Sequence, residues 1–219
     1  ITDANLKWAD MGNVYDKIIV GNKEYDFVKG VQAFKDKMLG YFPDEKQAID
    51  DYVSFVFKAI KTSQKFYMDK ALPPILSKII GGKMRNPFYK FSDKTTYEVL
   101  KSITNNEELI KVLCGQYGDY GLPPKQSSFV MHAAVARHYF GGGSFPVGGS
   151  SEIAKHTDTV IEKAGGTILI SAEVDEIIIE NNKAIGVKMK DGKTFFAKNT
   201  ISGAGIMTTY NKLIPEKTV

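Results

Sequence analysis

The sequence has very little cysteine and histidine. Cys114 is the only cysteine among 219 residues, which excludes an internal disulfide and any cysteine-rich metal site. His132 and His138 are six positions apart, so they would lie on different faces of a helix and would not share a metal ion. We therefore expect no metal site, and we interpret Cys114 as an ordinary core residue.

Long apolar stretches are also missing. The sequence has no run of about 18 apolar residues, the length that a membrane-spanning helix needs. It begins at Ile1 rather than Met, and no basic segment followed by an apolar one marks a signal peptide. We therefore expect a cytoplasmic protein, and we interpret the chain as a piece of a longer protein or a processed form.

The residues that are present are typical of a folded globular protein. Hydrophobic residues make up 43% of the chain and charged residues 25%. The 20 glycines and 8 prolines follow no period, which excludes a collagen-like or low-complexity chain. The length leaves room for one large domain or two small ones.

Positive charge is concentrated in one stretch of the chain. The net charge is only +4, but residues 53–101 contain ten Lys or Arg against three Asp or Glu. Aromatic residues such as Phe66, Tyr67 and Phe88 lie in the same stretch. The mixture is typical of a lysine-rich solvated helix face over a buried aromatic face, and also of a peripheral membrane contact. No nucleic-acid-binding signature accompanies it, so we expect no nucleic acid partner.

Hydrophobic spacing predicts a β-hairpin followed by a largely helical region over residues 41–139. Gly21 and Asn22 are the expected hairpin turn. The elements predicted before the middle of the chain are strands at 14–20 and 24–28, a helix at 28–39, a long helix from 44 to 68, and a short helix from 73 to 80 that two glycines end.

The sequence changes character at Gly148. Residues 151–164 are predicted to form a helix, and short β segments follow at 167–170, 174–180, 183–190, 193–197 and 199–203. The sequence therefore predicts an α+β fold in two parts. Residues 1–147 would be a helical part with a β-hairpin, and residues 148–219 a helix followed by a β-meander.

Three places are candidate ligand sites on residue type alone. Residues 148–151 precede a helix, where free N–H groups can hold an anion, but Glu152 would repel one and a tight loop explains the glycines equally well. Residues 201–205 (ISGAG) are small enough for a ligand or another backbone to approach. His138, beside a glycine-rich loop, is the one histidine that we consider as a proton donor.

Several motifs together resemble the FAD-dependent phytoene desaturase and carotenoid isomerase family. They are FPVGGSSEI at 145–153, EKAGG at 162–166, ISAEVDEI at 170–177, GVKMKDG at 186–192 and TISGAG at 200–205. CGQYGDYGLPP at 114–124 and QSSF at 126–129 are most similar to the all-trans-retinol 13,14-reductase branch of that family. The resemblance is strong from about residue 112 to 215.

The resemblance implies where a cofactor and a substrate would bind. Residues 1–147 would be the substrate-binding domain, and residues 148–219 part of a Rossmann-like FAD domain. Val174 falls where the family's backbone meets the adenine end of FAD, and Gly203 and Ala204 fall where a returning strand nears the cofactor. Gly203 departs from the Asn or Asp that relatives often have there. The resemblance places Phe145, Pro146, Gly148 and Gly149 at the junction that faces substrate and flavin.

The resemblance also implies a reaction. The parent protein would change the redox state or geometry of a carbon–carbon double bond in a polyene or similar lipid, as a saturase, desaturase or isomerase, with FAD as cofactor and NAD(P)H as a candidate electron donor. The chain lacks the family's Gly-x-Gly-x-x-Gly phosphate-binding fingerprint, so we expect it alone to be inactive and to bind FAD weakly or not at all. The alternatives are a non-enzymatic module that binds lipid or a membrane surface through residues 53–101, and an amine-oxidase-superfamily flavoenzyme with a smaller substrate.

Overall fold

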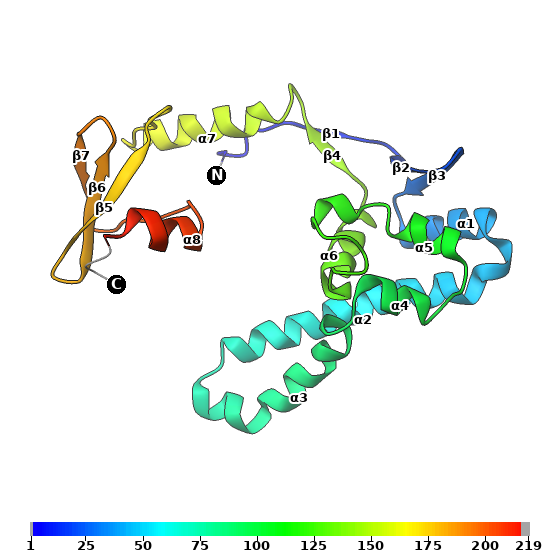
Figure 1. Ribbon diagram of the computed structural model, residues 1–219. Coiled ribbons are helices and arrows are strands. Elements are labelled where there is room, and N and C mark those ends of the chain that lie inside the picture. Colours follow the sequence, from blue (N-terminus) through cyan, green and yellow to red (C-terminus); the bar gives the residue numbers. More distant parts are fainter. Residues whose placement is uncertain (1, 216–219) are drawn as a thin grey trace. The chain divides into compact units, whose positions relative to one another are not determined.

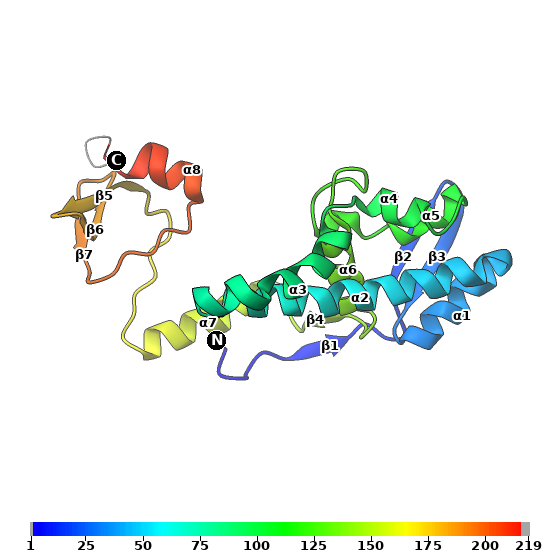
Figure 2. The same ribbon diagram turned by 90° about the horizontal axis from the view of Figure 1, so that it is seen from below.

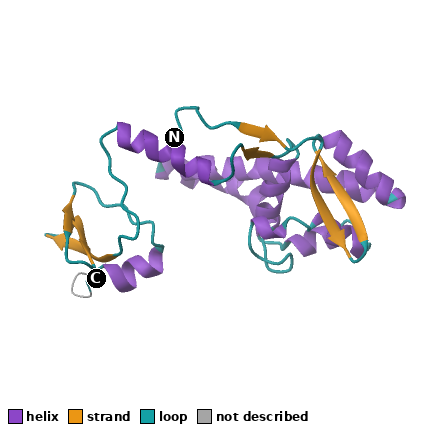
Figure 3. Cartoon of the chain, turned by 90° about the horizontal axis from the view of Figure 1, so that it is seen from above, coloured by secondary structure: helices purple, strands orange, loops and turns teal. Residues whose placement is uncertain are grey.

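The computed structural model describes residues 2–215, which form two compact units (Figure 1). The helical unit comprises residues 6–153, and the meander unit comprises residues 2–5 and 154–215. Helices predominate and the strands form three small sheets, so the α+β prediction is confirmed (Figure 3). The proposed domain boundary between residues 147 and 148 stays a prediction.

Two small antiparallel sheets belong to the helical unit. β2 (Val14–Val20) and β3 (Lys23–Val28) form the predicted hairpin, and Gly21 takes the positive φ of 62° that its turn needs. β1 (Trp8–Asp10) pairs with β4 (Ser144–Pro146), so two segments far apart in sequence form a short ribbon. Sequence analysis did not predict this pairing, because strands of only three residues are too short to show a β pattern.

Six α-helices make up most of the helical unit (Figure 2). The elements are α1 (Val31–Tyr41), the 3₁₀ turn η1 (Pro43–Glu45), α2 (Lys46–Lys70), α3 (Pro74–Ser92), α4 (Thr96–Lys101), α5 (Glu107–Leu113), the 3₁₀ turn η2 (Tyr117–Asp119) and α6 (Phe129–Tyr139). The predicted helical character of this region is confirmed. Thr95 and Glu98 form a reciprocal capping box at the start of α4, which satisfies backbone N–H groups that the helix leaves open.

The prediction that Gly81 and Gly82 end a helix is wrong, because α3 continues through both of them. Gly81 is buried where α3 contacts α2, and a Cβ there would collide with Asp69 and Arg85. This glycine therefore permits close helix packing rather than ending the helix. Helix propensity alone predicts a helix end at Gly81, because the packing partner Asp69 lies twelve positions earlier in the chain and is not part of the local sequence.

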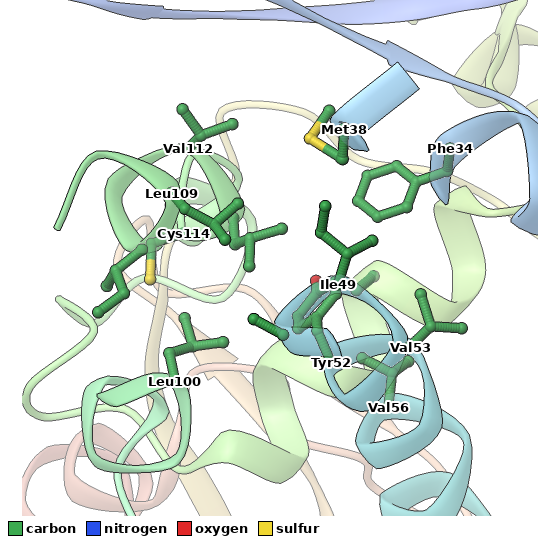
Figure 4. Packing of buried hydrophobic residues seen from close by; sticks show 14 of the residues in the cluster. Phe34, Met38, Ile49, Tyr52, Val53, Val56, Leu100, Leu109, Val112 and Cys114 are labelled. Carbon is green, nitrogen blue, oxygen red and sulfur yellow. The ribbon is translucent and has the colours of Figure 1, made fainter. Parts of the chain in front are cut away.

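One hydrophobic core holds the helical unit together (Figure 4). Phe34 and Met38 of α1 lie against Ile49 and Val56 of α2, and all four side chains are almost completely buried. Residues from the later helices complete the cluster: Leu100, Leu109, Val112, Leu113, Phe129 and Ala133. The core therefore fixes the positions of the hairpin, α5 and the loop after α5. The cleft described below lies between these three segments.

The meander unit is built on one antiparallel sheet. β5 (Val174–Glu180), β6 (Lys183–Met189) and β7 (Thr194–Phe196) pair in chain order, as predicted. The turn before β6 places Asn181 and Asn182 at positive φ, and Gly192 does the same before β7. The remaining elements are α7 (Ser151–Lys163), whose first three residues belong to the helical unit, α8 (Ile206–Thr208) and the π-helical turn η3 (Thr209–Leu213).

Two predicted strands of this unit, at 167–170 and 199–203, are not formed. Their apolar residues are exposed, with Ile170 at 87% and Ile201 at 95%. A β-strand is stable only when a neighbouring strand takes up its backbone hydrogen bonds. Within residues 2–215 neither segment pairs with another strand, so neither forms a β-strand despite its β-forming residues.

Candidate functional site

A large cleft of the helical unit lies between the β-hairpin, α5 and the loop over residues 115–126, which we call the cleft loop. Its volume is about 980 Å³. Ile18, Ile19 and Val20 of β2 form one wall, and the loop prolines Pro123 and Pro124 lie in the other. Because this loop carries the CGQYGDYGLPP motif, the cleft brings a motif singled out in the sequence together with a hairpin about a hundred positions earlier.

The loop is held closely against the hairpin. Gly115 has no room for a side chain, because a Cβ there would lie 2.6 Å from the side-chain carbons of Ile18. The side-chain amide of Gln116 donates a hydrogen bond to Asp16, at 3.1 Å from Nε2 to Oδ2. The close approach of Ile18 therefore favours glycine at position 115. The hydrogen bond of the neighbouring Gln116 holds the loop against the same strand.

Polar side chains also line the cleft. Tyr97 donates a hydrogen bond from its hydroxyl to Glu107 over 3.1 Å, and Lys125 Nζ lies 4.8 Å from the centre of the Tyr97 ring. Lys17 and Lys111 also line the cleft. Lys17 is already paired with Glu24 over 2.9 Å, and Glu107 adds a carboxylate to the lining. A lining that combines apolar side chains with a few charged groups suits an apolar ligand that has a polar end.

Cys114 lines this cleft but is not a nucleophile. The residue is buried, and burial raises the pKa of its thiol to about 12. A thiol with this pKa is protonated at neutral pH and reacts poorly, since the thiolate is the reactive form. Cys114 thus contributes apolar volume, in keeping with its interpretation as a core residue.

A buried histidine connects the loop to the core. His132 of α6 has Tyr52 Oη at 3.0 Å from Nε2 and Tyr120 Oη at 3.2 Å from Nδ1. A neutral imidazole has one donor and one acceptor, so one tyrosine donates to the ring and the other accepts from it. Burial lowers the pKa of His132 to about 4, which keeps the ring neutral. Sequence reasoning missed this arrangement because Tyr52 lies 80 positions away.

His138 lies near the C-terminal end of α6, exposed and edge-on to the ring of Tyr139. It is not among the residues that line the cleft. The structure thus does not bring this candidate proton donor to the cleft, and its catalytic role stays a prediction.

Phe145 and Pro146 lie in the ribbon, where Phe145 faces Ala9 and Pro146 faces Trp8. Phe145 is 53% exposed, while Pro146 is buried. Gly148 and Gly149 follow in a turn with φ angles of 95° and 101°, which only glycine adopts without strain. The structure therefore gathers the four residues predicted to face substrate and flavin at one end of the ribbon, outside the cleft lining.

The predicted cofactor residues belong to the meander unit. Val174 begins β5 opposite Met189. Gly203 lies in a hollow of about 430 Å³ that Ser202, Gly205 and Tyr210 help to line. Gly203 and Ala204 are exposed, and nothing lies within 4 Å of a Cβ built at Gly203. The backbone there is open to a ligand, but Val174 does not line the same hollow.

Binding a metal ion and crossing a membrane each require a specific arrangement of residues. Within residues 2–215, no group of three or more His, Cys, Asp or Glu side chains is arranged to hold a metal ion. In the same part of the chain, no helix combines the length and the apolar character that crossing a membrane requires.

Comparison with known proteins identifies relatives that carry related names. No family model matches the chain. It is 33% identical over 228 residues to an all-trans-retinol 13,14-reductase of Danio rerio, covering 99% of this chain and 38% of that protein. The all-trans-retinol 13,14-reductase of Homo sapiens is 34% identical, with 98% and 37% covered. Prolycopene isomerase 1 of an Oncidium hybrid cultivar, a chloroplastic protein, is 25% identical over 88% of this chain and 33% of its own length.

The chain therefore spans less than two fifths of the length of these relatives. The similarity covers both units, because it extends over almost every residue of the chain. The resemblance drawn from the sequence motifs is thus confirmed: the chain is homologous to one segment of the all-trans-retinol 13,14-reductases and, at lower identity, of the prolycopene isomerases.

Proposed function

We propose that the chain is a segment of an FAD-dependent oxidoreductase that acts on carbon–carbon double bonds of a polyene lipid, such as a retinoid or a carotenoid. The observation that carries the proposal is the match of 98–99% of the chain to proteins named all-trans-retinol 13,14-reductase. The prolycopene isomerase match adds a second relative named for a polyene. Both names support a long, apolar, conjugated substrate.

We assign part of the substrate to the cleft beside the CGQYGDYGLPP loop. The volume of about 980 Å³ is at the upper end of ordinary ligand sites. Ile18, Ile19 and Val20 offer apolar contacts, while Lys111 can meet a hydroxyl or carboxylate at the polar end of a lipid. Ring stacking against Tyr117, which also lines the cleft, suits a conjugated chain.

We assign contacts with FAD to the meander unit, with Val174 at the adenine end and Gly203 and Ala204 near the returning strand. The open backbone at Gly203 supports this, because a cofactor can approach it without a side chain in the way. When bound, the flavin supplies hydride transfer, and NAD(P)H is the candidate electron donor. The residues of this chain would hold and orient that group rather than perform the redox step.

The ribbon residues Phe145, Pro146, Gly148 and Gly149 are proposed to face both substrate and flavin. The exposed ring of Phe145 offers an apolar contact, and the two glycines keep the backbone free of side chains at the turn. Their role would be to shape the apolar passage and to keep water away from the reacting bond.

The chain by itself is proposed to be inactive. It has no Gly-x-Gly-x-x-Gly segment to bind the pyrophosphate of FAD. The purified chain, incubated with FAD and passed through a desalting column, should therefore show no stoichiometric flavin absorbance. Flavin retained at one equivalent per chain would overturn this part of the proposal.

The reaction is tested with a complete protein that contains this chain. All-trans-retinol and a cis-carotenoid are supplied separately, once with reduced flavin, which can donate electrons to a double bond, and once with oxidised flavin, which can accept them, and the products are separated by chromatography. Ile19→Glu places a charge on the cleft wall and should raise the KM at least tenfold, while Val14→Glu on the same strand lies outside the cleft lining and should leave it unchanged. Oxidation of small amines with no turnover of either polyene would favour the amine-oxidase alternative instead.

A further inference from the structure

The middle of the cleft loop, residues 118–122, does not line the cleft, although the residues on both sides of it do. Tyr117 precedes this segment and Pro123 follows it, and both belong to the cleft lining. The segment itself carries Tyr120, which contacts His132 of α6. The cleft loop thus meets the cleft on either side of its middle, while the middle is attached to the core of the helical unit.

Both ends of the cleft loop are fixed by contacts that do not involve Tyr120. At its start, Gly115 lies closely against the side chain of Ile18. Near its end, the backbone N–H of Tyr97 donates a hydrogen bond to the carbonyl of Pro124 over 2.9 Å. A change at Tyr120 therefore leaves both ends attached and should act on the segment between them.

Tyr120 attaches the middle of the loop through a buried histidine. Its hydroxyl lies 3.2 Å from Nδ1 of His132, and the two rings meet edge-on with 5.9 Å between their centres. Nε2 of His132 lies 3.0 Å from the hydroxyl of Tyr52, and these two residues are each only 2% exposed. Because a buried polar atom without a hydrogen-bond partner is costly, the histidine favours the loop position in which Tyr120 reaches it.

Tyr120 is coupled directly to Tyr117, because the two residues belong to one turn. The backbone N–H of Tyr120 donates to the carbonyl of Tyr117 over 3.2 Å, and the N–H of Gly121 donates to the same carbonyl over 3.0 Å. The side chain of Tyr117 is 47% exposed. A half-exposed ring on a surface turn loses conformational entropy when it takes one position, so it keeps that position only where other contacts hold the turn.

We propose that Tyr120, held by His132, is a positioning residue that keeps the ring of Tyr117 in the wall of the cleft. Tyr120 acts through the turn that it shares with Tyr117, since it lies outside the cleft lining. The proposal rests on the proposed function in one respect, the assignment of substrate to this cleft. Without the hydroxyl contact, the loop samples other positions, and binding must first select the one that the structure shows.

The kinetic test uses a complete protein that contains this chain, with the polyene that it converts. Tyr120→Phe removes one hydroxyl and keeps the ring. It should raise the KM about threefold to tenfold, the range expected for the loss of one hydrogen bond, and leave kcat unchanged, because bound substrate restores the loop position. The control is Tyr41→Phe, which should change neither constant. Tyr41 is also half-buried and accepts a hydrogen bond from the backbone N–H of Asp26, but it does not line the cleft.

A double-mutant cycle separates positioning from general destabilisation. Tyr117→Ala should raise the KM by itself, and adding Tyr120→Phe should raise it no further, because the ring that Tyr120 positions is then missing. An unchanged KM in Tyr117→Ala would overturn the assignment of substrate to the cleft, and the positioning role with it. A raised KM in Tyr117→Ala with no effect of Tyr120→Phe, or effects of the two changes that multiply, would overturn the positioning role alone.

Amide hydrogen exchange of the purified chain tests the attachment without the reaction. The amides of residues 120 and 121 donate to the carbonyl of Tyr117, so Tyr120→Phe should accelerate their exchange severalfold while amides of α5 keep their rates. His132→Leu removes the other partner and should accelerate the same amides. Circular dichroism checks that both variants remain folded. Unchanged exchange at residues 120 and 121 in Tyr120→Phe, or acceleration spread over the whole helical unit, would overturn the proposal.

Discussion

At the scale of single residues, His132 shows how burial sets chemistry. Its two tyrosine partners occupy both ring nitrogens, and the ring stays neutral because burial disfavours the charged form. No spacing rule applied to the sequence predicts such a triad, since the three residues come from α2, the cleft loop and α6. Sequence reasoning had no means of finding the two tyrosines.

The neutral state of His132 predicts an acid-sensitive fold. The unfolded histidine takes up a proton near its ordinary pKa of about 6.5, whereas the folded one does so only near 4. Between these values the unfolded chain binds more protons, so the free energy of unfolding falls as the pH drops, by up to about 1.4 kcal/mol per pH unit. Urea titrations across this range measure the slope.

The matched comparison uses two single variants. His132→Gln should flatten the slope of unfolding free energy against pH, whatever it does to stability at neutral pH. His138→Gln replaces an exposed histidine and should keep the slope. An unchanged slope in His132→Gln would show that another group causes the acid sensitivity.

Gly115 carries a second prediction for single residues. Gly115→Ala forces its methyl group onto the Ile18 side chain, so the hairpin and the cleft loop must separate and the protein should lose about 1–3 kcal/mol of stability. Gly118→Ala, three positions along the same loop, has open space around its Cβ and should be neutral. Thermal unfolding of the two variants compares them, and equal midpoints would contradict the tight packing.

At the scale of elements, sequence patterns identified most helices and the meander. They failed where contacts between residues far apart in the sequence determine whether a helix continues or a strand forms. The capped start of α4 and the hairpin turn at Gly21 are local, so their residues signal them. Gly81 looked like a helix end, although it serves the packing of α3 on α2. Residues 167–170 and 199–203 looked like strands, although strand formation depends on a partner that the sequence of the segment itself does not reveal.

The α2–α3 pairing predicts a local effect of Asp69. Asp69→Asn removes the negative charge that Arg85 and Ser77 contact, so α3 should loosen from α2. Amide hydrogen exchange in α3 should accelerate severalfold, while exchange in α5 remains unchanged. Asp51→Asn on α2 is the control, because Asp51 is half-buried and, within residues 2–215, its carboxylate accepts a hydrogen bond from Gln47 one turn away on the same helix. Uniform acceleration throughout the helical unit would instead indicate global destabilisation.

At the scale of the whole chain, the two units differ in how much core they contain. The helical unit holds nearly all of the buried apolar residues, whereas the meander unit buries Ile177 and Met189. The motifs at 145–153 and 170–177 identified the relatives correctly, yet the position of the cleft depends on core packing that motifs do not encode. The resemblance therefore predicted the family, whereas the position of the cleft beside residues 115–126 was found in the structure.

This difference predicts two separate unfolding steps. Because hydrophobic burial supplies most of the stability of a domain, the meander unit should open at lower urea than the helical unit. Hydrogen exchange measured at increasing urea should lose protection first in β5 and β6 and later in α2 and α5. A single transition shared by both sets of amides would show that the units unfold together.

The single buried cysteine gives the molecule its own unfolding reporter. Cys114 is shielded within the helical unit, and its protonated thiol reacts slowly with alkylating reagents. Each covalent label on the chain therefore records one opening of that unit, because there is no second thiol to confuse the count. Mass spectrometry of the labelled chain can thus follow how often the region around Cys114 opens, without an engineered probe.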